Sequence, residues 1–214
     1  MTLKLLTKKL ELSEEKFIES HLIKDYCNKL NLGYNVAIRY LVYNKRLYRI
    51  LRGIFYKPSI KERKLGMLEI NHIFALIEAL KRKKIKNWYF GLESAIKLNN
   101  LAHEYFAVDY IVNDTIFRAK PIKILGHKVK FVKVKKKLCT FGIKANNKIK
   151  FSDIEKTVLD MIYLLRYDGL NNTEIKSKIK EYIKHCSKDK LIKYSEKYNK
   201  KLIKFVGELV EKGN

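Results

Sequence analysis

The segment FSDIEKTVLD, residues 151–160, holds three carboxylates, a serine and a threonine. Asp153, Glu155 and Asp160 could bind a metal ion or act as general acid and base. Ser152 and Glu155 also have the S-x-x-E spacing of a capping box, in which each side chain binds the other residue's backbone N–H. Asp153 would add negative charge at the positive end of the helix dipole. We therefore interpret the segment as the start of a helix, and keep a metal-dependent nucleic-acid-processing enzyme as the alternative.

Other signatures of catalysis are missing from the sequence. It has no GxxxxGK[ST], GxGxxG, HExxH or GxSxG motif. The histidines do not fall at metal-ligand spacing; they are His21, His72, His103, His127 and His185. The three cysteines are too scattered for a disulfide framework or a metal knuckle. We expect no catalytic residue, no metal and no cofactor.

The charge balance favours a polyanionic partner. The chain carries 47 Lys and Arg against 22 Asp and Glu, for a formal net charge of +25, and such a field attracts nucleic acid or an acidic protein surface. The alternative is a lysine-rich surface that serves solubility and ion pairing. However, residues 26–61 hold 8 Lys and Arg without an acidic residue, and residues 115–152 hold 12. Because an ordinary soluble surface mixes both signs, the two tracts predict two anion-binding surfaces.

The order of elements near the N-terminus predicts a DNA-binding domain. Residues 1–30 have helical character, either as one bent helix or as two short ones. NLGYN (31–35) supplies a turn, and Asn35 can cap the next helix to about residue 44. RLYRILRGIFYKP (46–58) then has two β-prone runs around Gly53, which predicts a hairpin. Helix, tight turn, helix and basic hairpin is the order of a winged helix-turn-helix, so we expect such a domain over residues 1–60.

Residues of the second helix and of the hairpin are the expected DNA contacts. Asn35 and Arg39 would reach the major groove, while the hairpin cations would bind the backbone or enter the minor groove. The alternative for the hairpin is an edge strand protected by its charges. The full set is Tyr34, Asn35, Arg39, Tyr43, Arg46, Arg49, Arg52 and Lys57.

The rest of the chain predicts a mixed domain and a helical tail, with the domain boundary in the polar segment 59–66. Helical periodicity marks the segments 70–80, 91–101, 153–166, 172–185 and 188–212. Strand character marks the segments 107–112, 122–125, 128–134 and 148–151. The predicted fold class is thus α+β: the winged helix-turn-helix, a mixed α/β domain over 67–166 and a basic helical extension over 167–214.

A lysine-rich strand in the second acid-free tract is a candidate partner-binding site. Its residues Lys128, Lys130, Lys133 and Lys135 could bind RNA or an acidic protein, or they could form a solvated lysine face. No apolar run has the length of a membrane span, and the N-terminus lacks a signal-peptide core. We expect a cytoplasmic protein; the sequence leaves monomer and dimer open.

Three segments in this order resemble the AbiEi family of abortive-infection antitoxins: LYRILRGIFYKP, NWYFGLESAIKLNNL and FSDIEKTVLDMIYL. An R-G-aliphatic-aromatic signature is matched by residues 52–55. A small-residue helix core is matched loosely by residues 94–96. An acidic-x-Glu-[Arg/Lys]-Thr-x-x-Asp signature is matched by Asp153, Glu155, Lys156, Thr157 and Asp160. The similarity spans roughly residues 20–166, and the tail over 171–214 matches no motif of the family.

The resemblance implies two roles. The winged helix would bind operator repeats in double-stranded DNA and repress its own operon, and the C-terminal domain would counter a nucleotidyltransferase-like toxin in a type IV toxin–antitoxin system. A winged-helix regulator without a toxin partner fits the N-terminal residues equally well.

Overall fold

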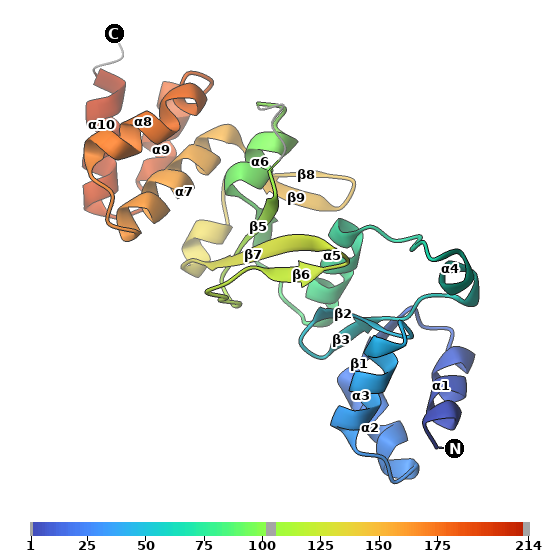
Figure 1. Cartoon of the computed structure of the whole chain (residues 1–214). Helices are drawn as coiled ribbons and strands as arrows, with labels where there is room; N and C mark the ends of the chain where they lie inside the picture. The colour runs from blue at the N-terminus through green and yellow to red at the C-terminus, as the bar shows by residue number, and fades with distance from the viewer. Residues whose placement is uncertain (1, 102–105, 212–214) are drawn as a thin grey trace. The chain divides into compact units, whose positions relative to one another are not determined.

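The computed structural model describes residues 2–101 and 106–211 (Figure 1). Within these residues the chain forms ten α-helices, one short 3₁₀ helix and two β-sheets, which is a mixed α/β architecture. Its contacts divide it into two compact units. Unit 1 comprises Met1–Lys86 with Lys123–His127, and unit 2 comprises Asn87–Ile122 with Lys128–Asn214. His103, one of the histidines considered above, lies outside the described residues.

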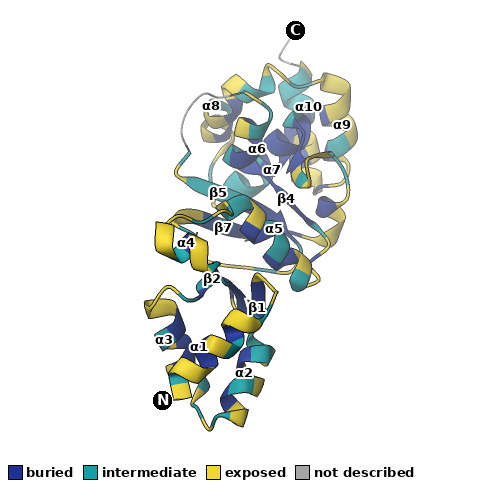
Figure 2. Ribbon diagram, turned by 90° about the vertical axis from the view of Figure 1, so that its right-hand side faces the viewer, coloured by how far each residue is buried: buried dark blue, intermediate teal, exposed yellow. Residues whose placement is uncertain are grey.

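Unit 1 contains five helices and a three-stranded antiparallel sheet with the strand order β1-β3-β2. Its elements are α1 (Thr2–Leu12), β1 (Phe17–Glu19), α2 (Ser20–Lys29), α3 (Tyr34–Tyr43), β2 (Tyr48–Leu51), β3 (Ile54–Tyr56), α4 (Ile60–Leu65) and α5 (His72–Arg82). Apolar side chains from α1, α2, α3 and the sheet form one core, which includes Leu6, Ile23, Leu41 and Phe55. Figure 2 shows buried residues, in dark blue, on these helices. The predicted hairpin is confirmed, and the predicted helix over 70–80 is confirmed as α5.

The N-terminal helical prediction is wrong in one respect, because a strand interrupts it. Phe17 and Ile18 are buried and pair with Tyr56 and Phe55 of β3. The backbone N–H of Ser20, the first residue of α2, also donates to the carbonyl of Gly53 at 2.9 Å. A strand of three residues is too short to show an alternating pattern, so only pairing with the distant β3 reveals it.

The segment 59–66, predicted as a domain boundary, is ordered within unit 1. Ser59 and Glu62 form a true capping box at the start of α4. The Glu62 carboxylate is 1% exposed and also accepts the Tyr56 hydroxyl at 2.6 Å. Arg82 of α5 pairs with Glu15 at 3.1 Å, which holds α5 to the segment before β1. The contacts therefore place the division between the units after Lys86.

Unit 2 is built on the larger sheet, whose strand order is β6-β7-β5-β4-β9-β8. The strands are β4 (Trp88–Phe90), β5 (Val108–Asn113), β6 (Ile122–Ile124), β7 (His127–Lys133), β8 (Ile143–Asn146) and β9 (Ile149–Ser152). β5 runs parallel to β7 and antiparallel to β4, and β9 runs parallel to β4. The sequence predicts neither β4 nor β8. β4 is buried in all three residues, as expected for a central strand without alternation.

Helices complete unit 2. They are α6 (Leu92–Leu98), the 3₁₀ helix η1 (Lys136–Cys139), α7 (Ile154–Tyr167), α8 (Asn172–Ile183), α9 (Lys188–Ser195) and α10 (Lys200–Glu211). The last predicted helix, over 188–212, is two helices, because Asn199 caps α10 by accepting the backbone N–H of Leu202 at 2.9 Å. α7 to α10 share one core with the sheet, including Val158, Ile175 and Phe205. The tail is thus a packed part of unit 2.

Among the described residues, none of the helices has the length and hydrophobicity needed to cross a membrane.

Candidate nucleic-acid interface

α3 presents a mixed polar and apolar face to solvent. Asn35, Arg39 and Tyr43 recur every four residues on its outer side, and all are exposed, Tyr43 to 85%. Ala37, Ile38 and Leu41 form the inner side and are buried. Val36 is 57% exposed on the outer side. The sequence did not single out Val36, and the only signal was its position off the apolar stripe.

One of the predicted DNA contacts on α3, Tyr34, does not lie on the exposed face of the helix. Tyr34 is half-buried and packs against the core of unit 1, and the Lys24 ammonium lies 5.4 Å from the centre of its ring. The N-cap of α3 is Gly33, without a side-chain hydrogen bond, so the predicted cap at Asn35 is wrong. Asn35 is instead a helical residue with an exposed side chain. Its amide is therefore available on the outer face of α3.

The hairpin after α3 carries two exposed arginines. Leu51 pairs with Ile54, so the turn consists of Arg52 and Gly53. Gly53 has φ +80°, a conformation that suits glycine, and a Cβ there would meet the Ser20 hydroxyl at 3.0 Å. Arg49 is exposed, and its guanidinium carbon lies 5.6 Å from the centre of the Phe55 ring. Two arginines thus project from one short hairpin.

The other two predicted hairpin contacts are engaged within unit 1. Lys57 is half-buried and donates to the carbonyl oxygens of Leu10, at 2.9 Å, and of Ser13. Burial lowers the pKa of the Lys57 ammonium, while Glu11 and Glu15 oppose this. Arg46 donates to the Glu11 carboxylate at 2.8 Å. These partners hold both cations against α1 and the segment after it.

The lysines proposed for partner binding do not form a single surface. Successive side chains of β7 alternate between the two faces of the sheet, so Lys128 and Lys130 lie on one face and Lys133 on the other. Lys130 donates to the carbonyl of Ala119. Lys135 is exposed after the strand, at the start of η1. The four lysines therefore point in different directions and do not present their charge on one surface.

The segment FSDIEKTVLD lies at the end of β9 and the start of α7, and its capping pattern differs from the predicted one. Asp153 is the N-cap and accepts the Lys156 backbone N–H at 2.9 Å. Ser152 belongs to β9, and its hydroxyl lies 2.7 Å from that of Thr157. Glu155 accepts the backbone N–H of Ser187 at 3.0 Å. The predicted capping box is wrong, because Ser152 continues the strand and Glu155 binds the distant segment before α9.

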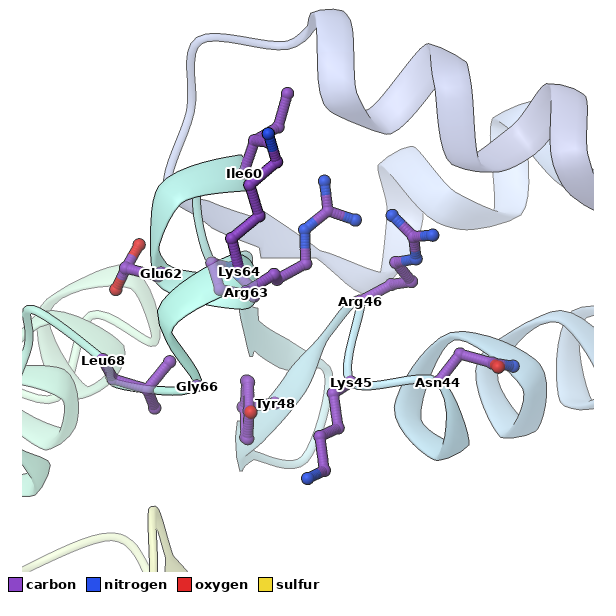
Figure 3. A pocket seen from close by; sticks show the side chains of 11 residues that line it. Asn44, Lys45, Arg46, Tyr48, Ile60, Glu62, Arg63, Lys64, Gly66 and Leu68 are labelled. Carbon is purple, nitrogen blue, oxygen red and sulfur yellow. The ribbon is translucent and has the colours of Figure 1, made fainter.

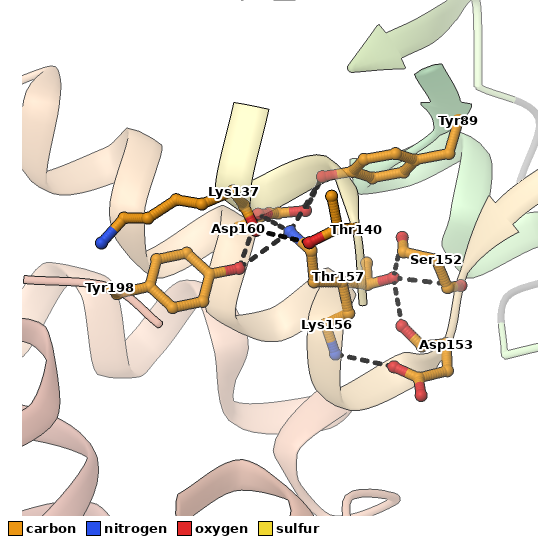
Figure 4. A network of polar contacts seen from close by, with 9 residues as sticks. All are labelled: Tyr89, Lys137, Thr140, Ser152, Asp153, Lys156, Thr157, Asp160 and Tyr198. Carbon is orange, nitrogen blue, oxygen red and sulfur yellow. Dashed lines mark hydrogen bonds and ion pairs between the residues drawn. The ribbon is translucent and has the colours of Figure 1, made fainter. Parts of the chain in front are cut away.

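Lys156 and Asp160 form the centre of a buried polar network (Figure 4). Their side chains are 0% and 1% exposed, with the ammonium nitrogen 2.5 Å from the carboxylate. The ammonium also donates to the hydroxyls of Tyr89, at 2.8 Å, and Tyr198, at 2.9 Å. Both tyrosines donate to Asp160 at 2.7 Å. The i,i+4 spacing of Lys156 and Asp160 permits this ion pair but gives no sign that it is buried.

Burial is the main cause of the pKa shifts in this network. It lowers the pKa of the Lys156 ammonium, which Asp160 partly restores. It raises the pKa of the Tyr89 and Tyr198 hydroxyls, and the negative charge of Asp160 raises both further. A buried ion pair survives only when further hydrogen bonds satisfy it, and the two hydroxyls do so here. The network joins β4, α7 and the segment between α9 and α10.

Gly142 gives α7 room beside this network. It has φ +62°, and a Cβ there would lie 2.7 Å from the Cβ of Lys156. Its carbonyl accepts the Asp153 backbone N–H at 2.8 Å. A larger residue would therefore be strained and would displace the start of α7.

The three carboxylates of the alternative enzymatic reading have partners within unit 2. Asp160 contacts Lys156 and two tyrosines, Glu155 accepts from Ser187, and Asp153 caps α7 and lies 3.2 Å from the Tyr194 hydroxyl. Burial raises the pKa of Asp153. Over residues 2–101 and 106–211, no three or more His, Cys, Asp or Glu side chains gather as a metal site would need.

Neither a protein-family model nor a curated protein matches the chain. A crystal structure of the RV2827C protein from Mycobacterium tuberculosis is similar in fold, with a TM-score of 0.55 and 11% sequence identity. The similarity covers 100% of this chain and 77% of that one. At this identity the likeness concerns the fold alone.

Proposed function

We propose that unit 1 is a winged helix-turn-helix that binds double-stranded DNA, and that the chain is a transcriptional regulator. The observation that carries this proposal is the exposed face of α3, where Asn35 and Arg39 stand beside the apolar side chains of Val36 and Tyr43. An asparagine and an arginine can make paired hydrogen bonds to purine edges in the major groove, and apolar groups suit the thymine methyl.

The hairpin supports the same assignment. In a winged helix, the helix before the hairpin enters the major groove, while the hairpin lies over the adjacent backbone. Arg49 and Arg52 are exposed there, and arginine binds phosphate oxygens through a planar fork of donors. Because the turn has only two residues, we assign these arginines to phosphates rather than to deep minor-groove contacts.

We further propose, from the resemblance to AbiEi antitoxins, that this regulator represses its own operon and counters a toxin encoded beside it. The resemblance rests on the order of three short segments in the sequence. It includes Lys156 and Asp160, which in this chain form the centre of the buried network. The antitoxin role would then belong to unit 2, with its surface as the effector and the network as its support.

A promoter–reporter fusion tests the regulatory role. DNA from upstream of the gene should drive a reporter that full-length protein represses, and substitution of Arg39 and Arg52 by glutamine should relieve repression at unchanged protein level. Unchanged expression with and without the protein would contradict the proposal. The antitoxin role has a separate test, since co-expression should restore growth of cells that express the neighbouring gene product.

A further inference from the structure

Unit 1 contains a cavity of about 450 Å³ between the end of α3, the start of β2 and α4 (Figure 3). Its volume falls within the range of small-molecule sites, about 300–1,000 Å³. Tyr48, Pro58, Ile60 and Leu68 give it apolar and aromatic walls. Such walls with a few convergent polar groups are typical of a ligand site.

The polar lining is strongly cationic. Lys45, Arg46, Arg63 and Lys64 all line the cavity, against the single carboxylate of Glu62. Both oxygens of that carboxylate accept hydrogen bonds from nearby groups. One oxygen accepts the Tyr56 hydroxyl at 2.6 Å and the Glu69 backbone N–H at 2.8 Å. The other oxygen accepts the Ser59 backbone N–H at 2.7 Å. Glu62 therefore organises the wall and keeps its negative charge, so the lining holds four cations against one carboxylate.

The two arginines are held in place from behind. One oxygen of Glu11 accepts from Arg46 at 2.8 Å and lies 2.7 Å from Arg63, so the two guanidinium groups lie close together (Figure 3). One carboxylate thus fixes two cations and leaves an excess of positive charge. Lys45 and Lys64 are exposed and form no ion pair with any residue that the structure describes.

We propose that this cavity binds the phosphate group of a small phosphorylated ligand of the nucleotide class. Lys45 and Lys64 extend in different directions (Figure 3), and both are exposed, so they would turn toward the cavity to bind the phosphate. Lysine is a compact cation suited to phosphate, and the fixed guanidinium pair would add to the field. The aromatic and apolar walls would receive the planar part of the ligand. Arg46, first expected to contact DNA, belongs to this cavity.

Calorimetric titration of the full chain with adenosine 5′-diphosphate and with inorganic pyrophosphate tests the proposal. Adenosine 5′-diphosphate should bind more tightly than pyrophosphate, because only it fills the apolar part. The double variant Lys45→Gln/Lys64→Gln should weaken both by about 10-fold or more, as expected for lost charged hydrogen bonds. The control Lys61→Gln/Lys81→Gln removes the same charge from α4 and α5 outside the cavity and should change affinity less than about 2-fold.

A thermal-unfolding midpoint equal to wild type would show that the double variant is folded. No binding of either probe to wild type at millimolar concentration, or equal weakening in the control, would overturn the proposal. A labelled DNA duplex separates the two sources of phosphate. If only the duplex binds and the cavity variant weakens it, the lining contacts the DNA backbone and the small-ligand site is refuted. If the probes bind and the duplex does not, the cavity stands and the proposed DNA function falls.

Discussion

Positive charge is placed in opposite ways in the two units. On α3 and the β2–β3 hairpin, Arg39 and Arg52 are exposed in a tract without acidic residues. In unit 2, Lys156 is fully buried against Asp160 and two tyrosine hydroxyls. The exposed cations contribute little to folding and are available to an anion, whereas the buried cation is bound by the fold itself. The number of positive residues is therefore a poor guide to function. Whether a cation can bind an external anion depends on whether groups within the fold already bind it.

The largest effect is expected from breaking the buried pair. Lys156→Met should lower the free energy of unfolding by about 3–5 kcal/mol, because it leaves the buried Asp160 carboxylate without its cation. The control Lys190→Met removes a lysine that is 51% exposed and lies 3.7 Å or more from its partners, and it should cost less than about 1 kcal/mol. Urea unfolding measures both. Equal costs would mean that the network is not a centre of stability.

The reverse pattern is expected in unit 1. Arg39→Gln/Arg52→Gln should weaken binding to a DNA duplex by roughly 10- to 100-fold at low salt, through loss of charge-assisted contacts. Urea unfolding should show little change, because both side chains are exposed. Lys178→Gln/Lys180→Gln removes the same charge from α8. Equal weakening by this control would show that affinity follows total charge and not the α3 face.

Alkaline pH distinguishes the buried tyrosines from the exposed ones. The pKa of Tyr198 is raised in the folded state, so its contribution is complete below the ordinary tyrosine pKa of about 10 and is lost as the pH rises above it. Between about pH 10 and 11, wild type should lose about 1 kcal/mol more stability than Tyr198→Phe does. Tyr167→Phe, at a position 85% exposed, should match wild type. A steeper fall in Tyr198→Phe would contradict this.

The smallest effect is expected at Glu155. Glu155→Gln keeps an oxygen that can accept the Ser187 backbone N–H, so it should cost about 1 kcal/mol or less and leave DNA affinity unchanged. A metal-dependent nuclease that used this carboxylate would instead lose turnover with its stability nearly intact. Urea unfolding and a nuclease assay with added Mg²⁺ distinguish the two outcomes.

Sequence patterns predicted the elements whose formation depends on residues close together in the chain. The periodicity of α5 and α7 and the glycine in the β2–β3 turn placed these elements within a few residues. β1 and β4 were missed because three residues carry no period, and their strand character comes from distant partners. The S-x-x-E spacing predicts Ser152 as a cap because it does not show that the strand continues through this residue.

The sequence predicts the exposure of a candidate-site residue where that exposure follows from helical periodicity. It does not predict exposure that depends on contacts with distant parts of the chain. Asn35, Arg39 and Tyr43 lie on the outer face of α3, as their spacing indicates. Lys57 is drawn inward by two carbonyls more than 40 positions earlier in the chain. Tyr198, which binds Lys156 from 42 positions away, has no sequence signal of its own.

The dependence of DNA affinity on salt tests the central claim most directly. Each phosphate contact should contribute a slope of about −0.9 in log K against log salt concentration. If Arg49 and Arg52 bind phosphates, a duplex from upstream of the gene should give a slope with a magnitude of roughly 2 or more per bound chain, and Arg49→Gln/Arg52→Gln should reduce that magnitude by roughly 2. Absent binding, or a slope that this variant leaves unchanged, would contradict the account.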